Sequence, residues 1–101
     1  MVVIVWTEKA DNDIEQIIDY WAAISENAAR LQIKRIFDKV EILETFPNSG
    51  RVVPEFGHPQ IREHISGPYR IVYYVVSQAR IDILAIHNSS KPLDANDFSP
   101  S

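Results

Sequence analysis

The chain has 101 residues, the length of one small domain, which we expect to span residues 1–101. It contains no cysteine, which excludes disulfides, thiolate zinc sites and a cysteine nucleophile. Its formal net charge of −4 argues against a protein that binds nucleic acid mainly through phosphates, and we expect no direct sequence-specific DNA binding by this chain alone.

The first apolar segment, VVIVW at residues 2–6, is short and rich in β-branched side chains. It predicts a strand that joins the sheet, either covered on both sides or close to helices. No stretch approaches the roughly 18 apolar residues of a membrane-spanning helix, and no basic region precedes this segment as in a signal peptide. We therefore expect a cytoplasmic protein that does not bind membranes.

Two helices should follow. Thr7 can cap the first, whose apolar residues recur at spacings of three and four and leave an acidic, solvated outer face. Ser25 or Asn27 can cap the second, which should end near Phe46 because Pro47 follows. The short connection predicts an antiparallel helical hairpin. The expected apolar positions are Ala10, Ile14, Ile17, Ile18, Trp21 and Ile24, then Ala29, Ile33, Ile36, Phe37, Val40 and Leu43.

The second half of the chain predicts strands. Residues 47–59 hold three of the six prolines and form a loop in which residues 51–53 can be briefly extended. The segments 61–66, 69–76 and 80–87 are rich in β-branched and aromatic residues, and their short connections predict an antiparallel meander. The tail at about 88–101 should be irregular. The order β-α-α-β-β-β defines an α+β fold, with the helical hairpin packed on an antiparallel sheet.

One arginine, Arg70, interrupts the apolar strand at 69–76, and a buried guanidinium needs a partner. Alternation places Arg70 on the face opposite Ile71. If helices cover the Ile71 face, Arg70 lies on a partner-facing side. It could dock a partner there, or pair with Glu63 or Asp82 on a neighbouring strand.

At this point the sequence resembles a known family. GRVVPE at 50–55, IRE at 61–63, YRIVY at 69–73 and ILAIH at 83–87 stand in an order similar to that of the RelE/ParE superfamily of toxins from type II toxin–antitoxin systems. The resemblance covers nearly the whole chain and is closer to the ParE branch. It implies a toxin of plasmid-stabilisation type that poisons DNA gyrase without catalysis, and a ParD-like antitoxin as partner.

The RelE branch is the alternative, and it implies a ribosome-dependent mRNA interferase. Cleavage at a 2′-hydroxyl needs a base, an acid and a cation. His87, Arg70 and a carboxylate such as Glu55 or Glu63 could supply them. Otherwise His87 simply hydrogen-bonds the tail and Glu63 pairs with an arginine. A third hypothesis is an inert relative that only binds an antitoxin.

The residues that we expect to contact a partner all lie in the second half of the chain. Tyr74 shares the face of Arg70, and Lys91 stands where the family often has arginine, so the planar fork of a guanidinium is lost there. Trp6 and Trp21 are expected in the core. The three histidines lack metal-ligand spacing, and we expect neither a metal nor a cofactor. The partner-binding candidates are Arg62, Arg70, Tyr74, His87 and Lys91.

Overall fold

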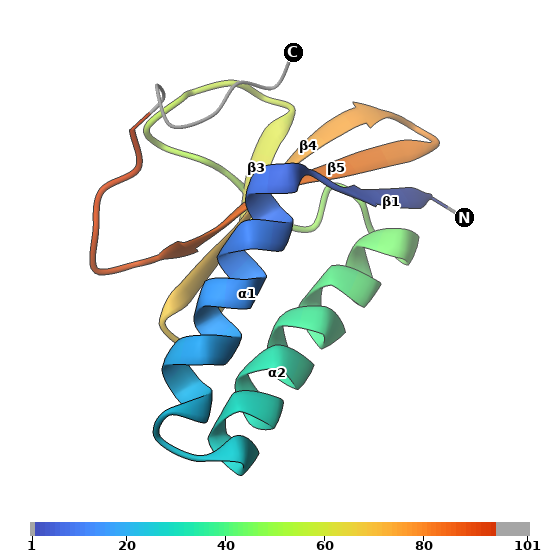
Figure 1. Ribbon diagram of the computed structural model, residues 1–101. Helices are drawn as coiled ribbons and strands as arrows, with labels where there is room; N and C mark the ends of the chain where they lie inside the picture. The colour runs from blue at the N-terminus through green and yellow to red at the C-terminus, as the bar shows by residue number, and fades with distance from the viewer. Residues whose placement is uncertain (1, 95–101) are drawn as a thin grey trace.

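The computed structural model describes residues 2–94 and shows two helices packed on one face of a five-stranded, mostly antiparallel sheet (Figure 1). The α+β fold predicted from the sequence is therefore confirmed. In chain order the elements are β1 Val3–Trp6, α1 Glu8–Ala22, α2 Glu26–Thr45, β2 Arg51–Val52, β3 Ile61–Ser66, β4 Tyr69–Ser77 and β5 Arg80–Asn88.

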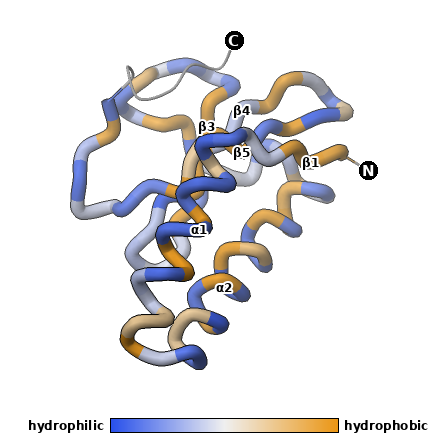
Figure 2. Tube along the Cα trace, in the orientation of Figure 1, coloured by the Kyte–Doolittle hydropathy of each residue, from blue (hydrophilic) through white to orange (hydrophobic). Residues whose placement is uncertain are grey.

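The helical hairpin forms where the sequence predicted it. The Thr7 side chain accepts a hydrogen bond from the amide of Ala10 at 3.2 Å, and Ser25 accepts one from Ala28 at 2.9 Å. Ser25, and not Asn27, is therefore the second cap. The second helix ends one residue before Phe46. Figure 2 shows hydrophobic and hydrophilic segments alternating along both helices, as expected for helices with one buried side.

The sheet has the strand order β1-β5-β4-β3-β2, and the predicted antiparallel meander forms its centre. The brief extension predicted at residues 51–53 is β2, which pairs with β3 at one edge. The other edge is β1, which runs parallel to β5 with Val3 opposite Arg80. The prediction that β1 is covered on both sides is wrong, because Val3 is 61% exposed. The alternative, that β1 lies close to the helices, is confirmed, because the ring centres of Trp6 and of Phe37 in α2 are 5.2 Å apart.

The main core lies between the helices and the sheet. Trp6 and Trp21 pack against it, as predicted. Two of the predicted apolar positions are exposed: Ile18 of α1 is 39% exposed, and Ile24, which follows the end of that helix, is 62% exposed. The buried residues of this core are Val2, Ala10, Ile17, Ile36, Val40, Leu43, Tyr69, Ile71, Tyr73, Ile81, Ile83 and Ile86.

A second, smaller core lies on the opposite face of the sheet. Val53 and Phe56 from the loop after β2 and Leu93 from the tail pack on this face. The face that carries Arg70 was expected to be open to a partner, and the loop and tail instead cover part of it. Residues 89–94 form no helix or strand, in agreement with an irregular tail, and the rest of the predicted tail, residues 95–101, lies outside the described part.

Neither helix in the part of the chain from residue 2 to residue 94 is long and apolar enough to cross a membrane.

Candidate functional site

Arg70 is the centre of a chain of ion pairs on the sheet face opposite the helices. Its Nε donates to Glu63 at 2.5 Å, and its two terminal nitrogens donate to the two carboxylate oxygens of Glu55 at 2.6 and 2.7 Å. The other oxygen of Glu63 accepts from Arg51 Nε at 2.6 Å. Arg70 is 8% exposed and Glu63 is 1% exposed, so the predicted need for a partner is met by two carboxylates.

Strand alternation and one tight turn bring these charges together. Glu63 of β3 lies opposite Val72 of β4, and Arg70 is two residues before Val72. Because side chains alternate along a strand, Glu63 and Arg70 therefore point to the same face of the sheet. Glu55 comes from the loop, where the amides of Phe56 and Gly57 both donate to Val53 and form a turn. Gly57 has a φ of 61°, which glycine adopts at little cost.

The predicted alternative partner, Asp82, does not reach Arg70. Asp82 lies opposite Tyr74, four residues along β4 from Arg70. Its carboxylate instead accepts from Arg80 Nε at 2.8 Å, two residues away on the same strand. Pairing of Arg70 with Asp82 is therefore wrong, and pairing with Glu63 is confirmed.

The ion pairs hold Glu55 and Arg70 in their charged states. The Arg70 guanidinium lowers the pKa of Glu55 from 4.5 to about 2, because it donates two hydrogen bonds to the ionised carboxylate. Hydrogen bonds from Arg70 to Glu55 likewise raise the pKa of the guanidinium. The two arginines, Arg51 and Arg70, balance the two glutamates, Glu55 and Glu63, so this group of ion pairs carries no net charge. A phosphate oxygen could bind Arg70 only in competition with carboxylates that already hold its Nε and both terminal nitrogens.

His87 stands directly across from Arg70 in the register of β4 and β5. Its Nε2 lies 2.9 Å from the backbone oxygen of Lys91, so the predicted hydrogen bond to the tail is confirmed. Between residues 2 and 94, no hydrogen bond joins His87 to Arg70 or Glu55. Arg70 and Glu55 are thus joined by hydrogen bonds, whereas His87 is bonded to the tail and not to this pair.

The remaining candidates for partner contact are dispersed. Arg62 lies on the helix side of β3 and donates to the Gly50 carbonyl at 2.9 Å. Tyr74 packs against the second core, with its ring 6.1 Å from that of His58. Only His87 and Lys91 lie at the same concave site, the cleft beside α1. Partner binding by all five candidates stays a prediction.

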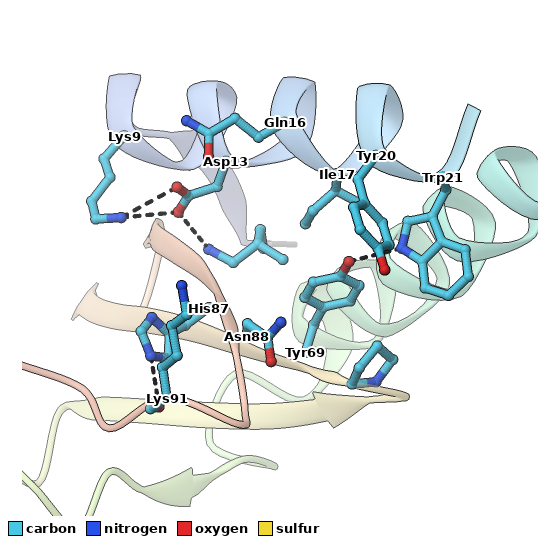
Figure 3. Close-up of a pocket in the computed structure, with 12 residues that line it drawn as sticks. Lys9, Asp13, Gln16, Ile17, Tyr20, Trp21, Tyr69, His87, Asn88 and Lys91 are labelled. Carbon is cyan, nitrogen blue, oxygen red and sulfur yellow. Dashed lines mark hydrogen bonds and ion pairs between the residues drawn. The ribbon is translucent and has the colours of Figure 1, made fainter. Parts of the chain in front are cut away.

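That cleft, about 630 Å³ in volume, lies between α1 and the ends of β4 and β5 that meet the tail (Figure 3). One end is aromatic, where Trp21 Nε1 donates to the Tyr69 hydroxyl at 2.8 Å and Tyr20 stands beside them. The other end is polar. The lining residues are Lys9, Asp13, Gln16, Ile17, Tyr20, Trp21, Pro68, Tyr69, Ile86, His87, Asn88 and Lys91.

Asp13 has a role in this cleft that the sequence did not predict. We expected it on a solvated acidic face, but its side chain is 16% exposed. Its carboxylate accepts from the amide of Ile86 at 3.0 Å and from Lys9 at 3.1 Å, which joins α1 to β5. Its spacing of four residues from Ile17 is a signal in the sequence that it could turn towards the sheet.

No group of histidine, aspartate and glutamate side chains that could hold a metal ion occurs among residues 2–94. The helical hairpin covers one face of the sheet, and the loop after β2 and the beginning of the tail pack on the other. The family described as "ParE toxin of type II toxin-antitoxin system, parDE" matches residues 4–92, and the chain belongs to this family.

A solved structure supports the same relationship. The chain is similar to a structure described as "Chromosomal ParDE TA system from P. aeruginosa", with a TM-score of 0.71 and 26% sequence identity. The match covers 87% of this chain and 96% of the other. A comparison with curated protein sequences gave no significant match. The resemblance seen in the sequence is therefore confirmed as membership of the ParE family.

Proposed function

We propose that this chain is a single-domain cytoplasmic toxin that stalls DNA gyrase and is neutralised by a ParD-like antitoxin. The observation that carries the proposal is the family match over residues 4–92. The similar P. aeruginosa structure is described as part of a ParDE system, which supports an antitoxin as partner. Gyrase as target and plasmid stabilisation as role remain predictions from the ParE branch.

The site chemistry favours gyrase binding over RNA cleavage. A nuclease would need Arg70 free to stabilise the charge on a reacting phosphate. Glu63 and Glu55 occupy that guanidinium, and His87 is engaged by the Lys91 carbonyl. The net charge of −4 further opposes work among ribosomal phosphates.

The cleft beside α1 is the surface on which we propose that the antitoxin docks. Tyr20, at the aromatic end of the cleft, is 63% exposed, and exposed tyrosine rings often anchor protein interfaces. Lys91 offers a cation at the polar end. A disordered antitoxin segment with apolar residues and a carboxylate would fold into this cleft and gain both contacts. Antitoxin bound there would prevent gyrase from binding the same surface.

Expression of the chain alone in a bacterial host, with supercoiling and mRNA integrity measured together, tests the target. We expect growth arrest, DNA-damage signalling and intact mRNA, and the purified chain should inhibit plasmid supercoiling by purified gyrase. Degraded mRNA with normal supercoiling would support the nuclease alternative, which also requires that His87→Ala abolish the degradation. Harmless expression would support the inert relative.

The docking surface is tested with the antitoxin encoded beside this gene. Tyr20→Ala and Lys91→Glu should each weaken its binding by at least about tenfold, as expected for the loss of an interface anchor or an ion pair. Arg80→Glu is the matched control for Lys91→Glu, because Arg80 lies at the start of β5, outside the cleft. Equal affinities for all four proteins, the unsubstituted chain included, would place the docking surface elsewhere.

A further inference from the structure

A second group of polar side chains lies on the helix side of β3, away from the cleft and from Arg70. It consists of Arg62 and His64 of β3, Ser49 of the loop after α2, and Lys39 of α2. The Ser49 hydroxyl is 2.7 Å from His64 Nε2. Burial, and then the charge of Lys39, lower the pKa of His64. Because Glu63 lies between Arg62 and His64 in the strand, its carboxylate points to the opposite face.

The positive charges of this group have no counter-ion. In the part of the chain that the structure covers, all the ion pairs involve other cations, and neither Arg62 nor Lys39 lies within ion-pairing distance of a carboxylate. Arg62 donates only to the carbonyls of Asn48 and Gly50, and its buried Nε donates to nothing. The half-buried guanidinium thus has carbonyl partners but no anionic one, and an anion bound at its terminal nitrogens would offset part of its desolvation cost.

A ring contact and a hydrogen bond hold the surface beneath these side chains in place. The His64 ring stacks on Tyr73 with 6.3 Å between the ring centres. The Tyr73 hydroxyl accepts from the Gly50 amide at 2.9 Å, which fixes the loop that carries Ser49. Side chains held by packing and hydrogen bonds lose little freedom when a ligand binds, so a small ligand can bind with useful affinity.

We propose that Ser49, Arg62, His64 and Lys39 form a binding site for a phosphate group, either free phosphate or a phosphate monoester. A guanidinium, an ammonium and a hydroxyl offer several donors to a tetrahedral anion, and charge-assisted hydrogen bonds of this kind are the strong ones. The site is independent of the proposed toxin function, and it would be occupied whether the target is gyrase or the ribosome.

His64 couples this site to pH. Burial, and then the charge of Lys39, lower the pKa of its ring, so the neutral imidazole is favoured near pH 7 and can accept a hydrogen bond from the Ser49 hydroxyl. The charged or titratable groups around it are Lys39 of α2, Arg62 of β3 and Tyr73 of β4, and burial raises the pKa of that tyrosine, which stays neutral. A bound dianion favours the imidazolium, so affinity for the anion rises as the pH falls.

Sulfate is the best first probe, since it remains a dianion across this pH range and any pH dependence then belongs to the protein. NMR signals of the His64 ring and the Gly50 amide should shift in a saturable manner, with severalfold tighter binding at about pH 5.5 than at about pH 7.5. Arg62→Gln should weaken binding by at least about tenfold, in keeping with one charge-assisted hydrogen bond.

Arg80→Gln is the matched control, because it removes the same charge from an exposed arginine that pairs with Asp82. Should Arg62→Gln unfold the protein, Lys39→Gln tests the site from α2, where this lysine is half-buried. Shifts that never saturate, or an equal loss in Arg80→Gln and the site variant, would overturn the proposal. Titration with inorganic phosphate and with O-phosphoserine then distinguishes free phosphate from a monoester, and the tighter ligand identifies the source.

Discussion

Arg70 and Glu55 form a two-pronged ion pair between the central strand β4 and the loop that covers the second face of the sheet. The same carboxylate accepts from the amide of Leu93 at 3.4 Å. One arginine therefore joins the sheet, the loop and the beginning of the tail. Bidentate geometry matters here, because a lysine at this position could not serve both oxygens at once.

Removal of Arg70 should destabilise the protein strongly. Arg70→Leu leaves the Glu63 carboxylate, whose side chain is 0% exposed, beside only the exposed Arg51. Breaking such a buried pair costs roughly 3–5 kcal/mol in the free energy of unfolding, measured by urea denaturation. Arg80→Leu, at a side chain that is 51% exposed, should cost at most about 1 kcal/mol. Similar costs for the two variants would contradict a structural role for Arg70.

The stability of the protein should fall with acid in a window set by Glu55. Its pKa is 4.5 when unperturbed and about 2 in the folded state, so the ionised carboxylate favours folding. This contribution is complete above about pH 4.5 and is lost as the pH falls through about 2. Because Glu55 is partly exposed, we expect it to amount to on the order of 1–2 kcal/mol.

Glu55→Gln isolates this effect. The difference in unfolding free energy between this variant and the unsubstituted protein should be largest at neutral pH and shrink towards pH 2. Glu26→Gln is the control, since Glu26 is 85% exposed at the start of α2. A constant difference across the acid range would show that the ionisation of Glu55 does not stabilise the fold.

Gly50 should not tolerate a side chain. A Cβ at this position would lie 2.6 Å from both the Glu63 carbonyl oxygen and the Tyr73 hydroxyl, and the carbonyl belongs to a paired strand that cannot yield. Gly50→Ala should cost about 1–3 kcal/mol by thermal or urea denaturation. Gly57→Ala, where the space is open but φ is positive, should cost only about 1 kcal/mol. The reverse ranking would contradict the close packing at Gly50.

Asp13 should matter more than its place on an acidic helix suggests. Asp13→Ala removes the acceptor of the Ile86 amide, and an unsatisfied donor of this kind costs about 1–3 kcal/mol. Hydrogen exchange at the Ile86 amide should accelerate by more than the loss of global stability explains. Asp19→Ala, an exposed aspartate of the same helix, is the control and should leave this amide unchanged.

Leu93 should stabilise the loop-covered face of the sheet. It is 6% exposed and packs with Val53 and Leu84 in the second core. Leu93→Ala should cost about 2–5 kcal/mol, whereas Leu93→Met should cost less than about 1.5 kcal/mol because volume is conserved. If both variants unfold at the same urea concentration as the unsubstituted protein, the tail contributes nothing to this core.

The sequence predicted those features that depend on local chemistry. The caps at Thr7 and Ser25, the stop before Pro47 and the alternation around Arg70 each follow from a few neighbouring residues. The partner Glu55 was not predicted as such, because it reaches Arg70 from a loop whose path depends on the turn at Val53. The exposed edge position of β1 was missed for a related reason. The sequence of an apolar strand is similar whether the strand lies at the edge or in the middle of a sheet. The position of β1 is decided only by its pairing with β5, near the other end of the chain.

That pairing has a consequence for the way the protein is made. Val3 and Trp6 of β1 pair with Arg80 and Ile83 of β5, so β1 can join the sheet only after nearly the whole chain has left the ribosome. Contacts so distant in sequence are slow to form, and proteins during synthesis fold as complete units become available. A ribosome that stops before β5 is finished therefore releases a chain without its native sheet. Incomplete translation should therefore yield no correctly folded protein.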